Sequence, residues 1–300
     1  MKKPFIHLGL SLLLLSCAIN NPDNGNKIPP MGGGDTLNVL TWNLQLFPKS
    51  SSRSVDYMFD AITALQPDVI ALQEISSEWH LQQLANRLPH YDYVIGPGGG
   101  NWGLAYLYNS SLIELDTVVY EIYRYNSRPF PRPPFVMEMR WNGKKIIVIN
   151  NHFKAGGDGY IDLSDPWDEE TRRVEAVALL HTYMETNFAN EKIILLGDLN
   201  DEIQEPPNRN VFQLWIDDSL FYRFTDMHIA KGSNLFWSYP SWPSSHLDHI
   251  LISNELFDHH HETKTILYDT YLDGRWTEYY QYISDHRPVG ISLIIPGEEE

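Results

Sequence analysis

The chain has 300 residues, a formal net charge of −17 and an ordinary share of charged residues, 20%. This length and composition suit one large globular domain, and the sequence shows no repeat of the kind that builds solenoids or propellers. An acidic surface repels the phosphates of a long nucleic acid unless a metal ion or a local basic patch compensates. A processive nucleic-acid binder is therefore disfavoured, whereas an enzyme whose carboxylates bind a divalent cation is not.

The first residues predict an export signal. Two lysines precede an apolar run from Phe5 to Leu15, which is too short to span a bilayer, and Ser16-Cys17 then resembles a bacterial lipobox. We expect residues 1–17 to be a lipoprotein signal peptide whose Cys17 carries the lipid; a plain secretory signal or a short membrane anchor are the alternatives. Because the chain has no other cysteine, it suits an oxidising compartment. The expected location is the bacterial cell envelope, on its periplasmic or cell-surface face.

After the signal, residues 18–35 are rich in Asn, Pro and Gly and are expected to form a flexible tether. The folded domain is expected to cover residues 36–297. Short apolar runs bounded by turn or polar residues predict ten strands: Leu37–Trp42, Val69–Leu72, Tyr91–Ile95, Leu104–Tyr108, Leu112–Tyr120, Phe135–Trp141, Ile146–Asn150, Ile193–Leu196, His249–Ile252 and Val289–Ile295.

Three helices are predicted between these strands, because apolar residues recur there at helical spacing. They cover residues 55–65, residues 81–88, and a longer stretch that is expected to begin at Asp165-Pro166 with a cap and a first-turn proline. The third helix is expected to bury a stripe from Val174 to Phe188. Ten strands imply more than one sheet, and helices laid outside them predict a layered α/β sandwich.

Eight polar residues stand at the ends of the predicted strands. Asn43, Glu74, His152, Asp198 and Asn200 follow strands, whereas Asp248, Asp285 and His286 precede them. Because a strand and its antiparallel neighbour share an edge at these ends, we expect all eight side chains to meet at one mouth. Carboxylates with amide oxygens suit Mg²⁺ or Mn²⁺ better than zinc. Each residue alone could be a turn former or a helix-end charge, but eight at one edge favour a metal site.

Five motifs carry a family resemblance: Leu40-Thr41-Trp42-Asn43, Leu72-Gln73-Glu74, Asn150-Asn151-His152, Gly197-Asp198-Leu199-Asn200 and Ser284-Asp285-His286-Arg287-Pro288-Val289. In order and spacing they resemble the endonuclease/exonuclease/phosphatase superfamily, across almost the whole expected mature chain. The resemblance implies a four-layered α/β sandwich, in which two mixed β-sheets pack face to face and helices flank them. It also implies hydrolysis of a phosphate ester by water that attacks in line at phosphorus.

Carried onto this sequence, the resemblance implies Mg²⁺ (or Mn²⁺) as the cofactor, with Glu74 as the principal ligand and Asn43 and Asp285 beside it. The other five residues receive catalytic roles. His286 is implied to be a general base or phosphate-contacting imidazole, and Asp248 orients it. Asp198 positions the attacking water, Asn200 hydrogen-bonds a phosphoryl oxygen, and His152 stabilises charge on the phosphate.

The substrate is less sharply indicated. Gln45 stands where apurinic endonucleases usually have Asp, which disfavours that subtype. Asp201-Glu202 follows Asn200 where phosphoinositide 5-phosphatases have an arginine two residues on, which disfavours that subtype as well. The segment 151–157 with Arg172-Arg173 resembles secreted bacterial nucleases of the family. We therefore expect a secreted phosphodiesterase or nuclease acting as a monomer without an evident protein partner. The alternatives are a sphingomyelinase-like or sugar/lipid phosphate phosphoesterase and, remotely, a non-enzymatic binding module.

Further residues have a functional and a structural interpretation each. The cations could contact phosphate or be ordinary surface charges, and the aromatic residues could stack on a base or pack between layers. Exposed apolar loops, which a lipid enzyme needs, are hinted at only by Phe153 and Trp242. His259-His260-His261 is expected to be a surface loop rather than a metal tract. The cations are Arg124, Arg128, Arg132, Lys154, Arg172 and Arg173, and the aromatic residues are Trp102, Phe236, Trp237, Tyr239 and Trp242.

Overall fold

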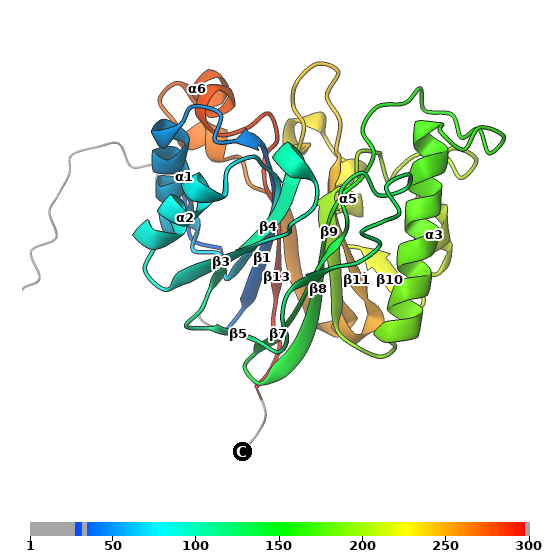
Figure 1. Ribbon diagram of the computed structural model, residues 1–300, viewed down its shortest axis with the longest axis horizontal. Coiled ribbons are helices and arrows are strands. Elements are labelled where there is room, and N and C mark those ends of the chain that lie inside the picture. Colours follow the sequence, from blue (N-terminus) through cyan, green and yellow to red (C-terminus); the bar gives the residue numbers. More distant parts are fainter. Residues whose placement is uncertain (1–27, 32–34, 298–300) are drawn as a thin grey trace, which may run out of the picture.

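In the computed structural model, residues 28–31 and 35–297 are described, and they form two β-sheets packed face to face with helices on the outside (Figure 1). This arrangement confirms the predicted four-layered α/β sandwich with two mixed sheets. The predicted signal peptide with Cys17 and most of the predicted tether lie outside the described residues. Within the described residues, no helix is both long and apolar enough to cross a membrane.

The first sheet has the strand order β12-β13-β1-β2-β4-β3, and the second has the order β10-β11-β9-β8-β7-β5, with β6 paired to β7. Their bounds are β1 Leu37–Phe47, β2 Val69–Ile75, β3 Tyr91–Ile95, β4 Gly103–Asn109, β5 Ile113–Leu115, β6 Tyr120–Glu121, β7 Phe135–Trp141, β8 Lys144–His152, β9 Ile193–Asp198, β10 Tyr222–Phe224, β11 Asp248–Ser253, β12 His260–Thr265 and β13 Val289–Leu293.

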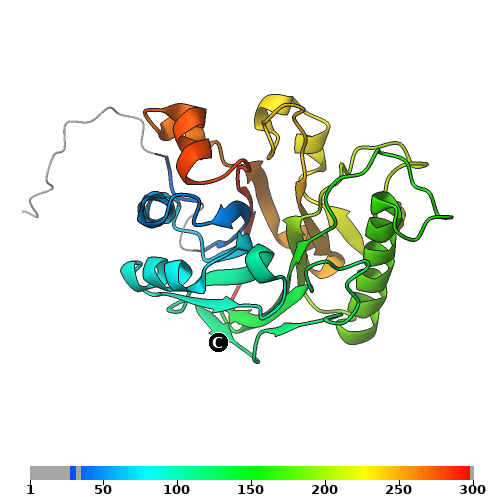
Figure 2. The ribbon, with the colours of Figure 1, turned by 45° about the horizontal axis from the view of Figure 1, so that its top comes forward.

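The α-helices are α1 Ser52–Leu65, α2 Glu78–Arg87, α3 Glu169–Asn187, α4 Gln213–Asp217, α5 Met227–Ala230 and α6 Arg275–Tyr282, with 3-10 turns at Gly100–Trp102, Asn234–Phe236, Asn254–His259 and Tyr268–Tyr271. Turned by 45°, the molecule shows α1 and α2 outside the first sheet and α3 outside the second (Figure 2). The sheets therefore lie in the middle of the sandwich.

Alternation along β1 explains how one strand serves two layers. Leu37 and Val39 face the second sheet in the central core, whereas Leu40 and Trp42 face α1 in an outer core. Successive side chains of a strand point to opposite faces, so a strand covered on both sides is apolar without interruption. The run Leu37–Trp42 is of this kind except at Asn38 and Thr41, which are also buried, so the sequence shows it as a mainly apolar segment.

Several boundaries differ from the prediction. The expected strand at 112–120 is split into β5 and β6, and β10 and β12 were not predicted. The third helix begins at Glu169 instead of after Asp165, because the Asp168 carboxylate caps it by accepting the Thr171 N–H at 2.7 Å. The expectation of a loop at His259-His260-His261 is wrong for the last two residues, which lie in β12 against β13.

The segment 28–31 lies against the domain, although it was expected to belong to the tether. Met31 is 3% exposed in the outer core beside α1, and its N–H donates to the Leu65 carbonyl at 2.9 Å. Ile28 also packs against that core. Apolar side chains interrupt the polar composition here, and their burial attaches this part of the chain to the domain.

Candidate active site

The eight residues predicted from the sequence all lie at one edge of the sandwich. In the first sheet, β1 and β2 run parallel and β13 runs antiparallel to β1, so two strands end where the third begins. In the second sheet, Asp198 pairs with His152 of the parallel strand β8 and with Asp248 of the antiparallel strand β11. The register therefore gathers side chains from six segments around one point.

A bulge near the end of β1 shapes the first part of the site. Gln45, Leu46 and Glu74 have positive φ angles of 45°, 61° and 60°. The bulge directs the Leu46 N–H to Glu74 Oε2 at 3.1 Å, while Asn43 Nδ2 donates to Glu74 Oε1 at 3.3 Å. Such backbone conformations cost about 1–3 kcal/mol each for residues other than glycine and concentrate at functional sites.

The Asp198 side chain contacts groups from both sheets. Its Oδ2 accepts a hydrogen bond from Asn43 Nδ2 at 2.8 Å, and its Oδ1 accepts the Asn200 N–H at 3.1 Å. His152 Nε2 lies 3.5 Å from the same Oδ2 and 3.9 Å from Glu74 Oε1. The carboxylate is 2% exposed. One buried carboxylate thus contacts groups from both sheets.

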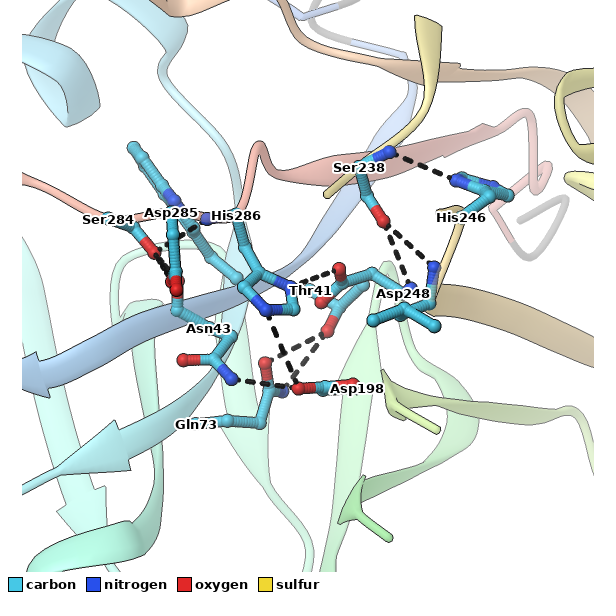
Figure 3. A network of polar contacts seen from close by, with 12 residues as sticks. Thr41, Asn43, Gln73, Asp198, Ser238, His246, Asp248, Ser284, Asp285 and His286 are labelled. Atoms are coloured by element: carbon cyan, nitrogen blue, oxygen red, sulfur yellow. Dashed lines mark hydrogen bonds and ion pairs between the residues drawn. The ribbon is translucent and has the colours of Figure 1, made fainter. Parts of the chain in front are cut away.

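His286 and Asp248 form a buried pair, shown with Asp198 and Asn43 in Figure 3. His286 Nδ1 lies 2.7 Å from Asp248 Oδ2, and its Nε2 lies 3.9 Å from Asp198 Oδ2. Ser284 fixes this loop, because its Oγ accepts the His286 N–H at 2.9 Å and donates to the Asn43 carbonyl at 2.6 Å. The imidazole is held by one carboxylate with its other nitrogen facing the second.

The charges in the site follow from this geometry. Burial alone lowers the pKa of His286, but the neighbouring carboxylates Asp248 and Asp198 outweigh it and raise that pKa to about 10. Burial raises the pKa of Asp198 to about 7, against the lowering effect of His286. His286 is therefore an imidazolium at neutral pH.

His152 has the opposite character. Burial lowers its pKa well below the ordinary value, and the charges of Arg132 and His286 lower it further. Its ring is 2% exposed, and Nδ1 has no hydrogen-bond partner among the described residues. A neutral imidazole with one free nitrogen can donate or accept one hydrogen bond, but it brings no charge to a phosphate.

Asn43, Glu74 and Asp285 fit a hard divalent cation by the chemistry of their donor atoms, which are carboxylate and amide oxygens. Among the described residues, Asn43 Oδ1 accepts only the Gln45 N–H at 2.9 Å, and the Asp285 carboxylate has only a 3.5 Å hydrogen-bond contact with the Ser284 hydroxyl. Both keep lone pairs for a ligand. Asp198, Asp248 and His286 also lie within 4.8 Å of one another, but the 2.7 Å hydrogen bond between the last two marks an acid–base pair rather than a metal cage.

A buried triad of one carboxylate and two imidazoles lies next to the segment that carries Asp248. The Asp226 carboxylate lies 3.0 Å from His246 Nε2 and 2.6 Å from His249 Nδ1, and all three side chains are fully buried. His246 Nδ1 accepts the Ser238 N–H at 3.2 Å, and Ser238 Oγ accepts the Asp248 N–H at 3.1 Å. The triad and Ser238 therefore fix the backbone that carries Asp248.

Arg132, one of the cations proposed from the sequence, is close enough to Asp198 and Glu74 for their charges to act on its pKa. Its Nη1 donates to the Phe153 carbonyl at 3.1 Å, next to His152, and its guanidinium lies 5.8 Å from the centre of the Trp102 ring. Burial lowers its pKa, while the charges of Asp198 and Glu74 act in the opposite direction. Arg132 is thus placed to face an anion bound at the site.

Other candidates separate into structural and exposed residues. Arg173 is 2% exposed and paired with Asp201 at 2.8 Å, so it is part of the buried framework. Phe153, which hinted at an exposed apolar loop, is 1% exposed, whereas Trp242 is 94% exposed. Two of the cations have carboxylate partners, since Arg124 pairs with Glu121 and Lys154 pairs with Glu169. Among the aromatic residues, Phe236 is exposed and Trp237 is partly buried. The centre of the Tyr239 ring lies 5.1 Å from that of the His286 ring.

Sequence reasoning missed Lys49, Asp226 and the roles of Ser238 and Ser284. The ammonium of Lys49 contacts Gln45 Oε1 and the Tyr280 carbonyl, beside the charges of Glu74 and Asp285. No spacing rule could have revealed these residues, because each lies far along the chain from its partner or outside the motifs. Only Ser284 stood inside a quoted motif, directly before Asp285.

Comparison with known proteins agrees with the geometry. The model of the family described as "Endonuclease/Exonuclease/phosphatase family" matches residues 40–286. No curated protein matches the chain in sequence. Among solved structures, D. rerio TDP2 in complex with a single-strand DNA product is 12% identical, with a TM-score of 0.61, and the match covers 86% of this chain and 98% of that one.

Two further solved structures have the same fold. The human Nocturnin catalytic domain with bound sulfate is 17% identical, with a TM-score of 0.61, and the match covers 86% of this chain and 94% of that one. A mannosyl-6-phosphatase from Bacteroides thetaiotaomicron is 18% identical, with a TM-score of 0.60, and the match covers 86% of this chain and all of that one. At such low identities the likeness establishes the fold alone.

Proposed function

The chain belongs to the endonuclease/exonuclease/phosphatase family, and we propose that it is a Mg²⁺- or Mn²⁺-dependent phosphodiesterase, specifically a nuclease. Members of this family are phosphoesterases that use divalent metal ions. The observation that carries the proposal is the buried His286–Asp248 pair, which faces Asp198 beside Asn43 and Glu74. That arrangement supplies a charged imidazolium for the phosphate, a carboxylate that can orient water, and oxygen ligands for a cation, all at one point.

Asn43, Glu74 and Asp285 are the proposed ligands of the cation, which when bound supplies charge stabilisation for the phosphate. Asp198 is proposed to orient the attacking water and to take its proton, since its raised pKa suits a base near neutral pH. Asn200, whose backbone is fixed by Asp198 at 3.1 Å, is proposed to donate to a phosphoryl oxygen through its side chain. In-line attack requires these groups to be positioned in advance.

The two histidines divide the remaining work. His286, kept charged by Asp248, is proposed to contact a phosphoryl oxygen as an imidazolium and to stabilise the charge that develops there. His152, kept neutral by burial, is proposed to donate a hydrogen bond rather than a charge. This assignment modifies the roles expected from the sequence, where His286 was a base or phosphate contact and His152 a charge stabiliser.

Export and lipid attachment at Cys17 are part of the proposal and rest on the sequence alone. The apolar run before Ser16-Cys17 supports a signal peptide, and a chain with one cysteine suits an oxidising compartment. Palmitate labelling of cells expressing the wild type and Cys17→Ser tests this. Label in the membrane fraction of the wild type alone supports the anchor, and equal labelling of both proteins contradicts it.

Turnover of a substrate panel tests the enzymatic proposal. The purified protein is given bis-p-nitrophenyl phosphate, plasmid DNA, sphingomyelin vesicles and hexose phosphates, with Mg²⁺ or Mn²⁺ and with EDTA. Cleavage of the small diester and of DNA, abolished by EDTA, is the expected result. If the protein cleaves the small diester and the lipid or sugar substrate but not DNA, the substrate is assigned to the lipid or sugar class instead. A folded protein that hydrolyses none of them with either metal contradicts the proposal.

A further inference from the structure

A patch of cations and aromatic rings lies beside the site, between the β6–β7 connection and the start of α3. We call it the α3-side patch. It includes the exposed rings of Trp102 and Trp167, which are 46% and 65% exposed. Its members are Trp102, Arg128, Arg132, Trp167 and Arg172.

Backbone carbonyls and ring faces hold these cations in place. Arg172 Nε donates to the Arg128 carbonyl at 2.6 Å, and its guanidinium lies 5.8 Å from the centre of the Trp167 ring. Arg128 Nη1 donates to the Pro166 carbonyl at 2.9 Å. Arg132 is held in the same way, by the Phe153 carbonyl and the Trp102 ring. The patch is therefore ordered without needing a carboxylate at each arginine.

The arginines of the patch have fewer paired carboxylates than charges. Arg128 pairs with Glu175, and Glu169 pairs with Lys154 at 3.2 Å while its charge also acts on Arg172. In the part of the chain that the structure describes, neither Arg132 nor Arg172 has a carboxylate oxygen within 4.0 Å. In a chain with a net charge of −17, two such cations near each other favour an anion from outside.

The patch continues from the catalytic centre. Arg132 is close enough to Asp198, Glu74 and Arg172 for all three charges to act on its pKa. Its carbonyl partner Phe153 directly follows His152. An anion held between Arg132 and Arg172 would therefore lie next to a phosphate at the site. Guanidinium groups bind phosphate through paired hydrogen bonds, and aromatic faces suit the rings of nucleotides.

We propose that the α3-side patch is a second anion subsite, in which Arg172 with Arg132 binds a phosphate group of the substrate adjacent to the one hydrolysed. This inference rests on the proposed function and narrows its substrate class to phosphate esters that carry a neighbouring phosphate. That chemistry has two sources, a nucleic-acid strand and a small bisphosphate. The positive charge of the patch would also offset the electrostatic repulsion between the acidic chain and such a substrate.

Matched substrate pairs test the subsite. The first pair is the dinucleotide thymidylyl-thymidine with and without a terminal phosphate, at the 5′ or the 3′ end, and the second is fructose 1,6-bisphosphate with fructose 6-phosphate. KM is measured for the wild type, for Arg172→Gln and for Arg223→Gln. Arg223 is a matched control, because its guanidinium also lies over a ring, 4.4 Å from the centre of Phe257, but on the edge strand β10.

The expected result is a KM about tenfold lower for the phosphorylated member of one pair, a preference that Arg172→Gln removes and Arg223→Gln keeps. A preference confined to the dinucleotides identifies a nucleic-acid strand, and one confined to the sugars identifies a bisphosphate. Equal KM values within both pairs in the wild type overturn the subsite, as does a preference that survives in Arg172→Gln.

A binding measurement separates this inference from the proposed function. If bis-p-nitrophenyl phosphate is not hydrolysed with either metal, the proposed function fails, yet binding at the subsite is still measurable in EDTA through the tryptophan fluorescence, to which the exposed Trp102 and Trp167 contribute. Tighter binding of the phosphorylated member of a pair by the wild type and by Arg223→Gln, but not by Arg172→Gln, supports the subsite. Equal binding of both members overturns it.

Discussion

The charge on His286 shows how the site depends on single contacts. The ring is buried, which by itself favours the neutral form, but Asp248 lies 2.7 Å away and Asp198 lies 3.9 Å away. The two carboxylates prevail, so the imidazole is charged at neutral pH. The motif Ser284-Asp285-His286 identified the residues from the sequence, whereas the charge state of His286 follows only from its distances to Asp248 and Asp198.

Asp248→Asn should lower the pKa of His286, because the largest influence that raises it is removed while burial remains. The imidazolium then deprotonates within the range in which the enzyme is assayed. NMR titration of the His286 ring in metal-free protein measures this shift. We also expect kcat to fall by about a hundredfold or more at pH 8. A His286 pKa equal to that of the wild type would contradict the assignment.

Asp68 provides a test of buried charge away from the site. Its Oδ2 accepts the Asn38 N–H at 2.7 Å and Asn38 Nδ2 at 3.1 Å, and burial raises its pKa to about 6. A carboxyl group with a raised folded-state pKa binds its proton more tightly when folded. The wild type therefore loses stability as the pH rises from about 4, the unfolded value, to about 6.

Asp68→Asn should remove this loss, since an amide oxygen can accept both hydrogen bonds without a charge. Relative to the wild type, the variant should gain about 2 kcal/mol more at pH 7 than at pH 4.5. Urea denaturation at both pH values gives the two free energies of unfolding. The same difference between the two proteins at both pH values would show that Asp68 is not the titrating group.

At the scale of elements, the close approach of β8 and β9 sets the position of Asp198. Gly197 has a φ of 146°, and a Cβ atom there would lie 2.0 Å from the Asn151 carbonyl oxygen on the neighbouring strand. Only glycine allows this distance. The adjacent residue Asp198 is thereby brought beside His152, with which it pairs in register.

Gly197→Ala is expected to cost about 3 kcal/mol of stability and to displace Asp198, because backbone rather than a flexible side chain opposes the new atom. Gly143→Ala is the control. It also has a positive φ, 75°, but no atom lies within 4 Å, so only about 1–2 kcal/mol of backbone strain is expected. Thermal unfolding and diester hydrolysis report both changes. Equal effects of the two substitutions would refute the steric argument.

Prediction from sequence worked where an element has apolar residues on a buried face. The buried strands β1, β2, β8 and β9 all lie on predicted runs. The edge strand β12 was missed, because its sequence His260–Thr265 is polar and pairs on one side only. The start of α3 was misplaced because Asp165-Pro166 fits the usual pattern of a cap followed by a first-turn proline, whereas the cap that forms depends on the contact of Asp168 with the Thr171 N–H.

The site residues were more predictable than the contacts between them. All eight stand at strand ends, which the apolar pattern located. The supporting residues Asp226 and Ser238 act on Asp248 from other segments, and no local pattern connects them. Their contribution depends on a chain path that only the folded structure reveals.

At the scale of the molecule, the two sheets contribute different parts of the site. The proposed metal ligands, with His286, come from the first sheet and its connections, whereas His152, Asp198, Asn200 and Asp248 come from the second. Beneath the site, Gln73 Nε2 of the first sheet donates to Asn150 Oδ1 of the second at 2.8 Å. Asn150 Nδ2 donates back to the Leu72 carbonyl at 3.0 Å. Buried polar contacts thus fix the relative position of the sheets.

Asn150→Ala should therefore lower both stability and kcat. It removes the interior contacts of Asn150 with Gln73 Nε2 and with the Leu72 carbonyl, at an expected cost of about 3 kcal/mol. Asn187→Ala at the end of α3 is the control, with an expected change of about 0.5 kcal/mol or less, because its exposed amide donates to the Tyr183 carbonyl of the same helix. Urea denaturation and turnover of the small diester measure both. A fully active and stable Asn150→Ala protein would contradict the role of these contacts.

The most direct test of the metal-dependent site is the Mn²⁺ dependence of bis-p-nitrophenyl phosphate hydrolysis by Glu74→Gln. Glu78→Gln, four residues later and exposed on α2, serves as the control. We expect the rate of Glu74→Gln to fall by about a hundredfold or more at every Mn²⁺ concentration that saturates the wild type, with Glu78→Gln unchanged. A Glu74→Gln protein with the rate and the Mn²⁺ dependence of the wild type would contradict the proposed metal-dependent site.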